Sequence, residues 1–308
     1  MAERPAYLSL SPLIHWLHGT RPVDWDRVFG RPADLEVELG FGLGDFLVRT
    51  AGRYPDKNFV GIDLGWVQVK RALRKIARAR LKNVRVVRAD ARVALERLFP
   101  EKSIERIWCL FPCPWPKGRH ARHRLFSGGF LRLMNSRLGM DGNALVVTDH
   151  RPYFEWIRAR VPGTGFEDFP EITPPRFFTK YERKWRDLGQ DRFYSLRLVK
   201  REHLPVAPKE DLELITHIID HFAPERFRPG GSRGELMVEF KEFLYDPGAR
   251  KGMVRTVVKE ESLLQNFWIE IALLEDGWHI RPARGCGFVP TAGVQRSLDL
   301  VRDAAVEG

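Results

Sequence analysis

The segment Leu35-Glu36-Val37-Glu38-Leu39-Gly40-Phe41-Gly42-Leu43-Gly44 contains the pattern that decides the fold. A short apolar run, residues 35–39, ends at the first of three glycines spaced two residues apart. Glycines at the end of a strand permit a tight turn, and the helix that follows presents free backbone N–H groups to a ligand. We therefore predict a strand, a glycine-rich turn and a helix, which together begin a parallel α/β sheet.

The same alternation continues along the chain. Between residues 66 and 78, the apolar residues Trp66, Val69, Leu73 and Ile76 recur at helical spacing, and cationic residues take the other faces. Short strands that alternate with amphipathic helices indicate an α/β fold with a doubly wound, mostly parallel sheet, whose ligands lie beyond the carboxyl ends of the strands. Four further apolar runs are predicted strands: residues 59–62, 84–87, 104–111 and 144–148.

A second, smaller α+β domain is predicted after the Pro-Val-Ala-Pro linker at residues 205–208. The predicted domains are therefore residues 1–204 and residues 205–308. Five elements are expected in the second domain, in the order α-β-β-β-α: a helix with Leu212, Ile215, Ile219 and Phe222 on one face, strands near 236–240, 254–258 and 267–273, and a helix over about 291–304.

Charge and composition narrow the function. The formal net charge is +11, but residues 205–308 carry −4 and residues 1–204 carry +15. This asymmetry indicates a polyanionic partner for the first part, most commonly nucleic acid, with a membrane surface or a nucleotide as alternatives. Since no apolar run approaches the ~20 residues of a membrane span and no signal-peptide core is present, we expect a soluble, cytoplasmic protein. Three cysteines without paired spacing predict neither a disulfide framework nor a metal site.

Three acidic residues follow three successive predicted strands. Glu38 precedes the glycines, where a carboxylate would repel a pyrophosphate but would suit the cationic end of S-adenosylmethionine. Asp63 is placed to accept the ribose hydroxyls, and Asp90 lies where an adenine amino group would be. Each acid alone has a simpler reading as a helix cap. Together they favour an adenosine-containing cofactor without phosphate, and the glycine spacing differs from the dinucleotide fingerprint of nicotinamide-linked oxidoreductases.

A stiff, basic loop follows the fourth predicted strand. Residues 112–117 contain three prolines and a tryptophan, and six cationic or titratable side chains follow between Lys117 and Arg124. Such a loop is a good phosphate clamp, although arginine-rich loops are often only solvated surface. Residues 70–88 add nine Lys or Arg and no acid, and this positive charge is consistent with binding to nucleic acid.

Residues from about 25 to 200 resemble the tRNA (guanine-N7)-methyltransferases, which have a class I methyltransferase fold and use S-adenosylmethionine. The resemblance is an ordered series of stretches: residues 38–44, 59–63, 90–91, 114–117 with 119–120, 148–149 with 152–153, and 179–182. It implies cofactor binding by Glu38, Gly40, Gly42, Gly44, Asp63 and Asp90. It implies binding of the target guanine and its nucleotide by Lys117, Arg119, Asp149, Thr179 and Glu182. Taken alone, residues 148–149 and 179–182 have a simpler reading as helix caps.

This sequence departs from the family pattern at a position of the expected active centre. Cys113 stands where the family has Asp between two prolines, which removes a carboxylate. Asp63 replaces a family Glu, and Arg122-His123-Arg124 replaces Lys-Arg-Arg. The simpler reading of Cys113 is a small side chain that is tolerated because Asp149 and Glu182 supply negative charge.

Two functions remain open from the sequence. The first is methylation of guanine N7 in tRNA, at the variable-loop guanine by resemblance, and the second is a catalytically weakened RNA-binding paralogue that keeps the cofactor pocket. The expected partner is tRNA, with no membrane partner, and the protein is either a monomer or a homodimer.

Overall fold

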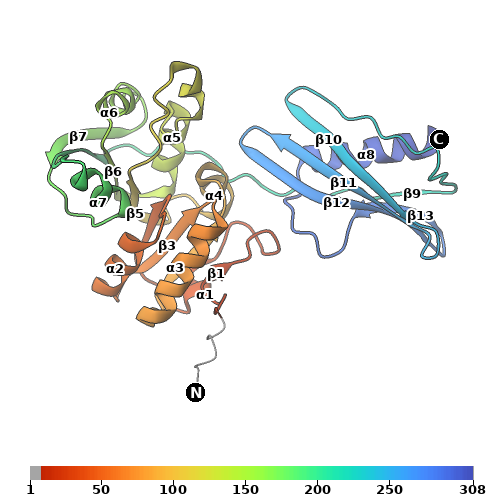
Figure 1. The fold of residues 1–308 in the computed structure, drawn as a ribbon, viewed down its shortest axis with the longest axis horizontal. Coiled ribbons are helices and arrows are strands. Elements are labelled where there is room, and N and C mark those ends of the chain that lie inside the picture. The colour runs from red at the N-terminus through yellow and green to blue at the C-terminus, as the bar shows by residue number, and fades with distance from the viewer. Residues whose placement is uncertain (1–7, 308) are drawn as a thin grey trace. The chain divides into compact units, whose positions relative to one another are not determined.

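The computed structural model describes residues 8–307 and divides them into two compact units (Figure 1). The first comprises the described residues up to Trp16 together with Thr20–Lys209. The second comprises Leu17–Gly19 and the described residues from Glu210 onward. Within residues 8–307, none of the helices is both long and apolar enough to cross a membrane.

The first unit is built on a mostly parallel sheet, as predicted. Its described residues form eight strands in the order β1-β4-β3-β2-β5-β6-β8-β7, and only the pairings of β8 with β6 and β7 are antiparallel. The strands are β1 Leu13–Ile14, β2 Leu35–Leu39, β3 Asn58–Asp63, β4 Val84–Arg88, β5 Ile104–Leu110, β6 Leu138–Thr148, β7 Phe166–Thr173 and β8 Phe193–Lys200.

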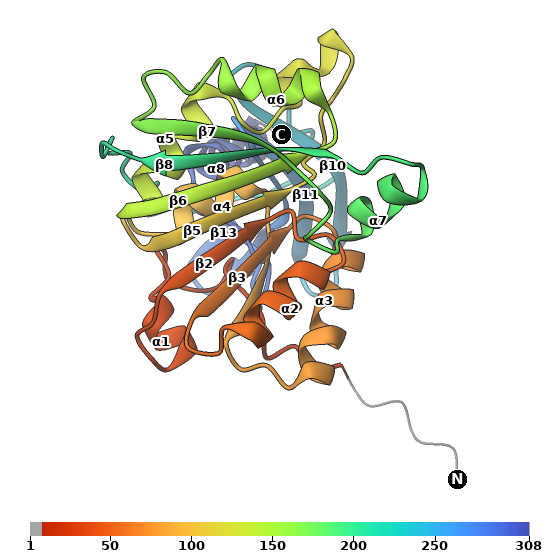
Figure 2. The same ribbon diagram turned by 90° about the vertical axis from the view of Figure 1, so that its left-hand side faces the viewer.

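Helices connect these strands. They are α1 Trp25–Phe29, α2 Asp45–Arg53, α3 Trp66–Ala79, α4 Ala91–Leu98, α5 Gly128–Arg137, α6 Arg151–Arg158 and α7 Lys180–Asp187, with a 3₁₀ helix, η1, over Gly118–His123. Figure 2 shows α2 and α3 side by side against β3. In α3, Val69, Leu73 and Ile76 are buried as the spacing predicts, whereas Trp66 in the first turn is 42% exposed.

The second unit is a five-stranded antiparallel sheet with one helix, within its described residues. Its strand order is β10-β11-β12-β13-β9. Helix α8 packs Val294, Leu298 and Val301 against apolar residues of the sheet such as Ile269 and Ile271. The elements are β9 His217–Ile219, β10 Leu236–Asp246, β11 Lys251–Glu260, β12 Leu263–Leu274, β13 Gly277–Pro282 and α8 Ala292–Glu307.

The second unit has the predicted α+β fold class, but the prediction of a first helix through Leu212, Ile215, Ile219 and Phe222 is wrong. Residues 210–216 form no regular element, and Ile219 lies in β9, which pairs with β13. The β-branched residues Ile215, Thr216, Ile218 and Ile219 favour extended backbone, and the edge of β13 offers hydrogen bonds to it. The spacing of the apolar residues is therefore compatible with a helix although the segment is extended. Strand β13 was not predicted.

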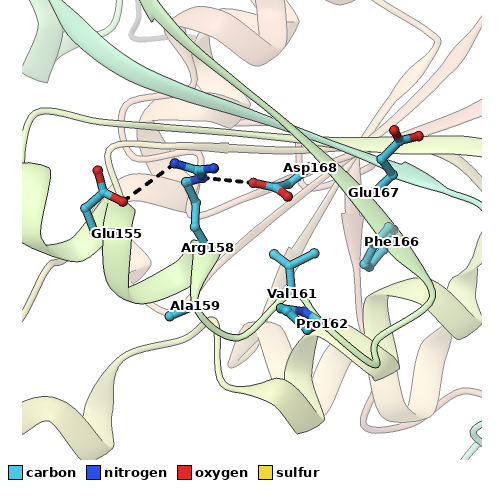
Figure 3. Close-up of a pocket in the computed structure, with 8 residues that line it drawn as sticks. All are labelled: Glu155, Arg158, Ala159, Val161, Pro162, Phe166, Glu167 and Asp168. Carbon is cyan, nitrogen blue, oxygen red and sulfur yellow. Dashed lines mark hydrogen bonds and ion pairs between the residues drawn. The ribbon is translucent and has the colours of Figure 1, made fainter.

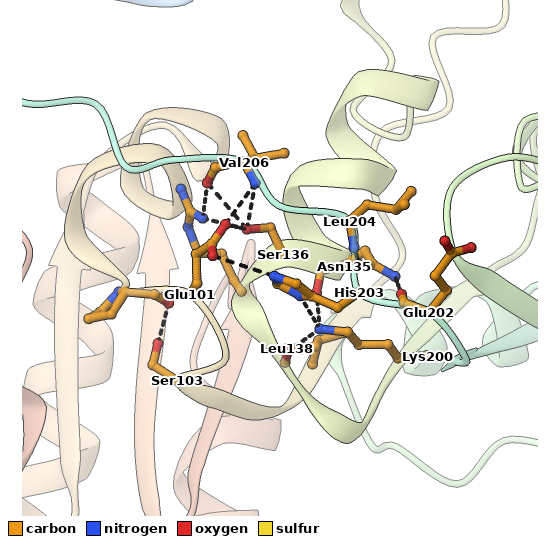
Figure 4. Close-up of polar contacts among 12 residues, drawn as sticks. Glu101, Ser103, Asn135, Ser136, Leu138, Lys200, Glu202, His203, Leu204 and Val206 are labelled. Carbon is orange, nitrogen blue, oxygen red and sulfur yellow. Dashed lines mark hydrogen bonds and ion pairs between the residues drawn. The ribbon is translucent and has the colours of Figure 1, made fainter.

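The chain segment after β8 is anchored by buried polar groups (Figure 4). Lys200 is buried and its Nζ donates to the carbonyls of Asn135 and Leu138, at 2.8 and 2.6 Å. Burial lowers the pKa of Lys200 to about 8. The fully buried guanidinium of Arg137 donates from Nε to Leu95 O at 2.7 Å and from Nη1 to Val206 O at 2.6 Å. Residues 200–206 are thus part of the packed first unit.

We predict that Arg137→Ala lowers the free energy of unfolding by about 3 kcal/mol. The substitution leaves buried carbonyls without donors, and hydrogen bonds to charged groups contribute roughly 1.5–3 kcal/mol each. Urea titration followed by circular dichroism measures the change. Arg132→Ala, at an exposed position of the same helix, is the control and should shift stability by no more than about 0.5 kcal/mol. Equal effects of the two variants would contradict this account of the anchor.

Candidate functional site

Strands β2 to β6 bring the predicted site residues to one edge of the sheet. These strands run parallel, so their carboxyl ends meet at the same edge, the usual position of ligands in open α/β sheets. The glycine turn follows β2, Asp63 ends β3, Asp90 follows β4, Cys113 follows β5 and Asp149 follows β6.

The glycine turn has a backbone that glycine alone adopts readily. Gly40, Gly42 and Gly44 have φ values of 70°, 55° and 72°, in the left-handed region. The N–H of Gly42 donates to Oδ2 of Asp63 at 3.0 Å, and the N–H of Gly65 donates to Oδ1 at 2.9 Å. Asp63 therefore connects the turn after β2 to the turn after β3, and each of its oxygens can accept a further hydrogen bond.

Glu38 lies beneath the glycine turn and is the most unusual charged group of this unit. Its side chain is 3% exposed, and among the described residues no group hydrogen-bonds to its Oε2. Burial, reinforced by the nearby charge of Asp63, raises the pKa of Glu38 to about 8. A buried polar atom without a partner is rare in native proteins. It marks a place where a cationic or hydrogen-bond-donating ligand group would compensate the cost of burial.

Glu38 borders a small cavity of about 80 Å³. The glycine turn, Phe46 and Leu110 line one side, and Thr179–Tyr181 at the start of α7 line another. Ligand pockets commonly enclose roughly 300 Å³ or more, so the cavity would hold one end of a ligand. The remainder of such a ligand would lie along the sheet edge toward Asp63 and Asp90.

Asp90 acts as the N-cap of α4, the simpler of its two predicted roles. Its Oδ1 accepts the N–H groups of Arg92 at 2.8 Å and Val93 at 3.3 Å. A ligand would therefore meet Oδ2.

Thr179 and Glu182 hold backbone rather than pointing free carboxylate or hydroxyl groups at the edge. Thr179 is the N-cap of α7, and its Oγ1 accepts the N–H of Glu182 at 3.1 Å. Glu182 is buried, and its carboxylate accepts three successive N–H groups, those of Arg176, Phe177 and Phe178. The role that this geometry supports for Glu182 is to fix residues 176–178 beside the cavity.

Two functional contacts around α7 were missed by the sequence reasoning. Asp45 at the start of α2 forms ion pairs with Lys75 of α3 and Arg183 of α7, which lower its pKa against the opposing effect of burial. Arg49 of α2 donates to Phe177 O, and its guanidinium lies 4.6 Å from the ring centroid of Phe178. No local pattern distinguishes these residues, because the chain has many arginines and the contacts of Asp45 with Arg183 and of Arg49 with Phe177 span more than 100 positions.

The basic loop after β5 is exposed but anchored. Arg124 donates to Pro114 O at 2.9 Å and to Trp115 O at 3.3 Å, and its guanidinium lies over the rings of Tyr153 and Trp156 of α6. Cys113 is exposed on this loop, in contrast to Cys109, which is buried in β5.

Lys117 and Arg119 are exposed at the start of η1. Asp149 is half-buried at the end of β6, where its carbonyl accepts a bond from Gln190 at 3.4 Å. These three side chains are available to an external partner, whereas Glu38 and Glu182 are enclosed.

A larger hollow of about 560 Å³ lies away from this edge, between α6 and β7 (Figure 3). Its charged groups are all paired, since Arg158 pairs with Asp168 at 2.9 Å and with Glu155 at 3.7 Å, and Glu167 pairs with Arg201 at 2.6 Å. It is wide and open, and no polar group in it lacks a partner in the way that Glu38 does. The edge at Glu38 is therefore the candidate site.

Comparison with known proteins identifies the family of this chain. A family described as "Putative methyltransferase" matches residues 32–195. A tRNA (guanine-N(7)-)-methyltransferase of Chlorobium phaeobacteroides is 41% identical over 170 residues, which cover 55% of this chain and 83% of that protein. Proteins of the same name from Aquifex aeolicus and Thermus thermophilus are 30% and 31% identical, covering 91% and 93% of this chain and 97% and 90% of their own lengths.

The family match lies within the first unit, which carries the glycine turn and Glu38, while the two longer alignments also run through most of the second unit. The ordered motifs and these alignments agree: the chain belongs to the tRNA (guanine-N7)-methyltransferase family.

Proposed function

We propose that this protein transfers a methyl group from S-adenosylmethionine to N7 of a guanine in tRNA. The observation that carries the proposal is the buried Glu38, whose Oε2 has no partner among residues 8–307 and borders the cavity under the glycine turn. With a pKa of about 8 this carboxyl is mostly protonated before a ligand binds, and a cationic group beside it would favour the carboxylate form. The carboxylate in this enclosed position suits the cationic end of S-adenosylmethionine and would repel a pyrophosphate. Membership of the family favours this activity over a catalytically weakened RNA-binding paralogue.

The fit of the other residues supports the cofactor. Asp63 would accept the ribose hydroxyls with the lone pairs that Gly42 and Gly65 leave free, and Oδ2 of Asp90 would accept the adenine amino group. Gly40, Gly42 and Gly44 keep the backbone close to the ligand because no side chain intervenes. When bound, S-adenosylmethionine supplies an electrophilic methyl group on a sulfonium.

The chemistry requires little of the protein beyond alignment. N7 of guanine carries an in-plane lone pair and no proton, so attack on a methyl sulfonium needs no general base. Positive charge develops on the purine, and negative groups at the sheet edge would stabilise it. Asp149 is available for this purpose, while Cys113 stands where the family has a carboxylate and supplies no such charge in its thiol form.

The exposed cationic side chains of the first unit would bind the tRNA backbone. Lys117 and Arg119 present positive charge beside the site, and more lies on the solvent-facing side of α3. That side carries Lys70, Arg71, Arg74 and Arg78. We assign the methyltransferase role to the first unit, which extends through Lys209. Because tRNA is the proposed substrate, the proposed location is the cytoplasm.

Mass analysis of tRNA nucleosides tests the activity. Unmodified tRNA incubated with the purified protein and S-adenosylmethionine should gain 7-methylguanosine. Absence of that nucleoside would overturn the assignment, and binding of NADH without binding of S-adenosylmethionine in calorimetry would indicate a nicotinamide-linked oxidoreductase instead.

We predict that Glu38→Gln weakens S-adenosylmethionine binding at least tenfold and makes the protein more stable at high pH. The folded-state pKa of about 8 lies above the usual 4.5, so the folded protein holds a proton that the unfolded chain releases in this window. The free energy of unfolding therefore falls as pH rises from about 4.5 to about 8, by an amount on the order of a few kcal/mol. Gln does not ionise and removes this loss.

Calorimetric titration and thermal melts at pH 5 and pH 9 measure both effects. Glu155→Gln, on the exposed side of α6, is the control and should change neither. A variant that binds the cofactor as tightly as wild type would contradict the role of Glu38.

We predict that Cys113→Asp accelerates the single-turnover methyl-transfer step without tightening tRNA binding, because a carboxylate would stabilise the developing purine cation. Cys113→Ser should resemble wild type, since a hydroxyl replaces a small neutral thiol. Rapid-quench kinetics measure the step. Loss of a robust activity in both variants would mean that the thiol has a specific role.

We predict that Arg74→Glu weakens tRNA binding and lowers the slope of log affinity against log salt by about one or more, because charge-driven binding releases counterions from contacted phosphates. Arg296→Glu makes the same charge change at an exposed position of α8 and should leave the slope unchanged. Fluorescence anisotropy over a salt series measures both. Equal slopes for the two variants would remove α3 from the RNA interface.

A further inference from the structure

The backbone of residues 176–178, which we call the strap, is fixed from both sides. Its three N–H groups all donate to the carboxylate of Glu182. Its carbonyls are held as well, because Arg49 donates to Phe177 O and Arg183 donates to Phe178 O at 2.8 Å. A segment with this many bonds to charged groups has little freedom to move.

The two phenylalanines of the strap have opposite environments. Phe177 is buried, and its ring packs 6.0 Å from that of Phe46. Phe178 is 56% exposed and has a φ of 55°, a left-handed conformation that is uncommon for a residue other than glycine. The structure therefore holds an aromatic ring in solvent with a strained backbone, a combination that clusters at ligand sites.

Arg49 supports one face of this ring. Its guanidinium lies 4.6 Å from the centroid of Phe178, within the range of a cation–π contact. An aromatic ring has two faces, so the second face is available for a flat partner. The strap thus presents a rigid, flat and apolar surface.

The chain itself, a hydrogen bond and an ion pair connect this surface to the proposed cofactor site. Phe178 directly precedes Thr179–Tyr181, which line the cavity that Glu38 borders. Arg183 bonds to Phe178 O and pairs with Asp45, the first residue of α2 after the glycine turn. The ring is therefore positioned relative to the glycines by a short series of bonds.

We propose that Phe178 stacks on the target guanine; this inference rests on the proposed function. A base that undergoes chemistry must leave its stack in the RNA, and an aromatic side chain replaces the lost stacking. Methylation at N7 makes the guanine cationic, and the face of an aromatic ring attracts cations. The ring of Phe178 would therefore stabilise the positive charge that develops on the guanine during methyl transfer.

Four variants test the stacking role: Phe178→Ala, Phe178→Leu, Phe178→Trp and, as the control, Tyr54→Ala. Tyr54 is also exposed, at 41%, and also lies beside an arginine, but it follows the far end of α2. Phe178→Ala and Phe178→Leu should slow single-turnover methyl transfer by 10- to 100-fold, because stacking on one base is typically lost on this scale. Phe178→Trp should stay within threefold of wild type, and Tyr54→Ala within twofold.

A second measurement needs no turnover. Calorimetric binding of 7-methylguanosine monophosphate to the full-length protein should weaken at least fivefold in Phe178→Ala and be retained in Phe178→Trp. In both variants, the affinity for S-adenosylmethionine should stay within twofold of wild type. Their melting temperatures should stay within a few degrees of wild type.

The failures are distinguishable. A wild-type protein that makes no 7-methylguanosine overturns the proposed function, whereas an active wild type with Phe178→Ala at the same rate overturns the stacking role. Rescue by Phe178→Leu would show that apolar packing suffices and overturn stacking as well. A loss of S-adenosylmethionine affinity in Phe178→Ala equal to the loss of rate would assign the ring to the adenine of the cofactor instead.

Discussion

The hydrogen bond from the Gly42 N–H to Asp63, 3.0 Å long, is the interaction on which the site depends. It joins the turn after β2 to the end of β3 and holds a left-handed backbone in place over Glu38. Because the same carboxylate also accepts the Gly65 N–H, one side chain positions the turns from which both α2 and α3 begin. The glycine turn in turn sets the position of Asp45, and Asp45 pairs with cations on α3 and α7.

This arrangement places opposite electrostatic demands on neighbouring acids. Glu38 is enclosed, and the opposing charge of Arg49 is outweighed by burial and by the charge of Asp63, so its protonated form is favoured before a ligand arrives. Asp45, on the next turn of chain, has two cationic partners, and its pKa is held below the usual range. The carboxyl group of Glu38 is therefore available to a charged ligand, whereas that of Asp45 is occupied by its ion pairs with α3 and α7. A binding site of this kind costs stability, which the surrounding core of α2, α3, β3 and β4 offsets.

The parallel part of the first unit was predictable because β2 to β6 are short apolar runs that alternate with amphipathic helices, whereas β1, β7 and β8 were not predicted. The site residues at strand ends followed from the same rule, since parallel strands must deliver their ends to one edge. The roles of Glu182 and Asp90 at this edge were less predictable. A carboxylate at a helix start fits both a ligand and a cap, and only the folded structure shows which backbone N–H groups it accepts.

The residues missed entirely act over long sequence distances. Arg49 and Phe177 are 128 positions apart, and nothing local marks either as half of a pair. In the second unit, the spacing of Leu212, Ile215, Ile219 and Phe222 fits a helix, yet β-branched residues beside an open strand edge formed β9 instead. Pattern reasoning succeeds where one periodicity is available and fails where two are compatible with the same apolar residues.

The anchor of residues 200–206 bears on how the chain can be divided. A cut between Leu204 and Pro205, at the linker that the prolines suggest, would remove the Val206 carbonyl that Arg137 bonds and the Val206 N–H that Glu101 accepts at 2.7 Å. The shortened protein would expose a buried guanidinium and lose activity through instability, which would be mistaken for a catalytic contribution of the second unit. A dissection that retains the chain through Lys209 keeps these bonds intact and separates the two effects.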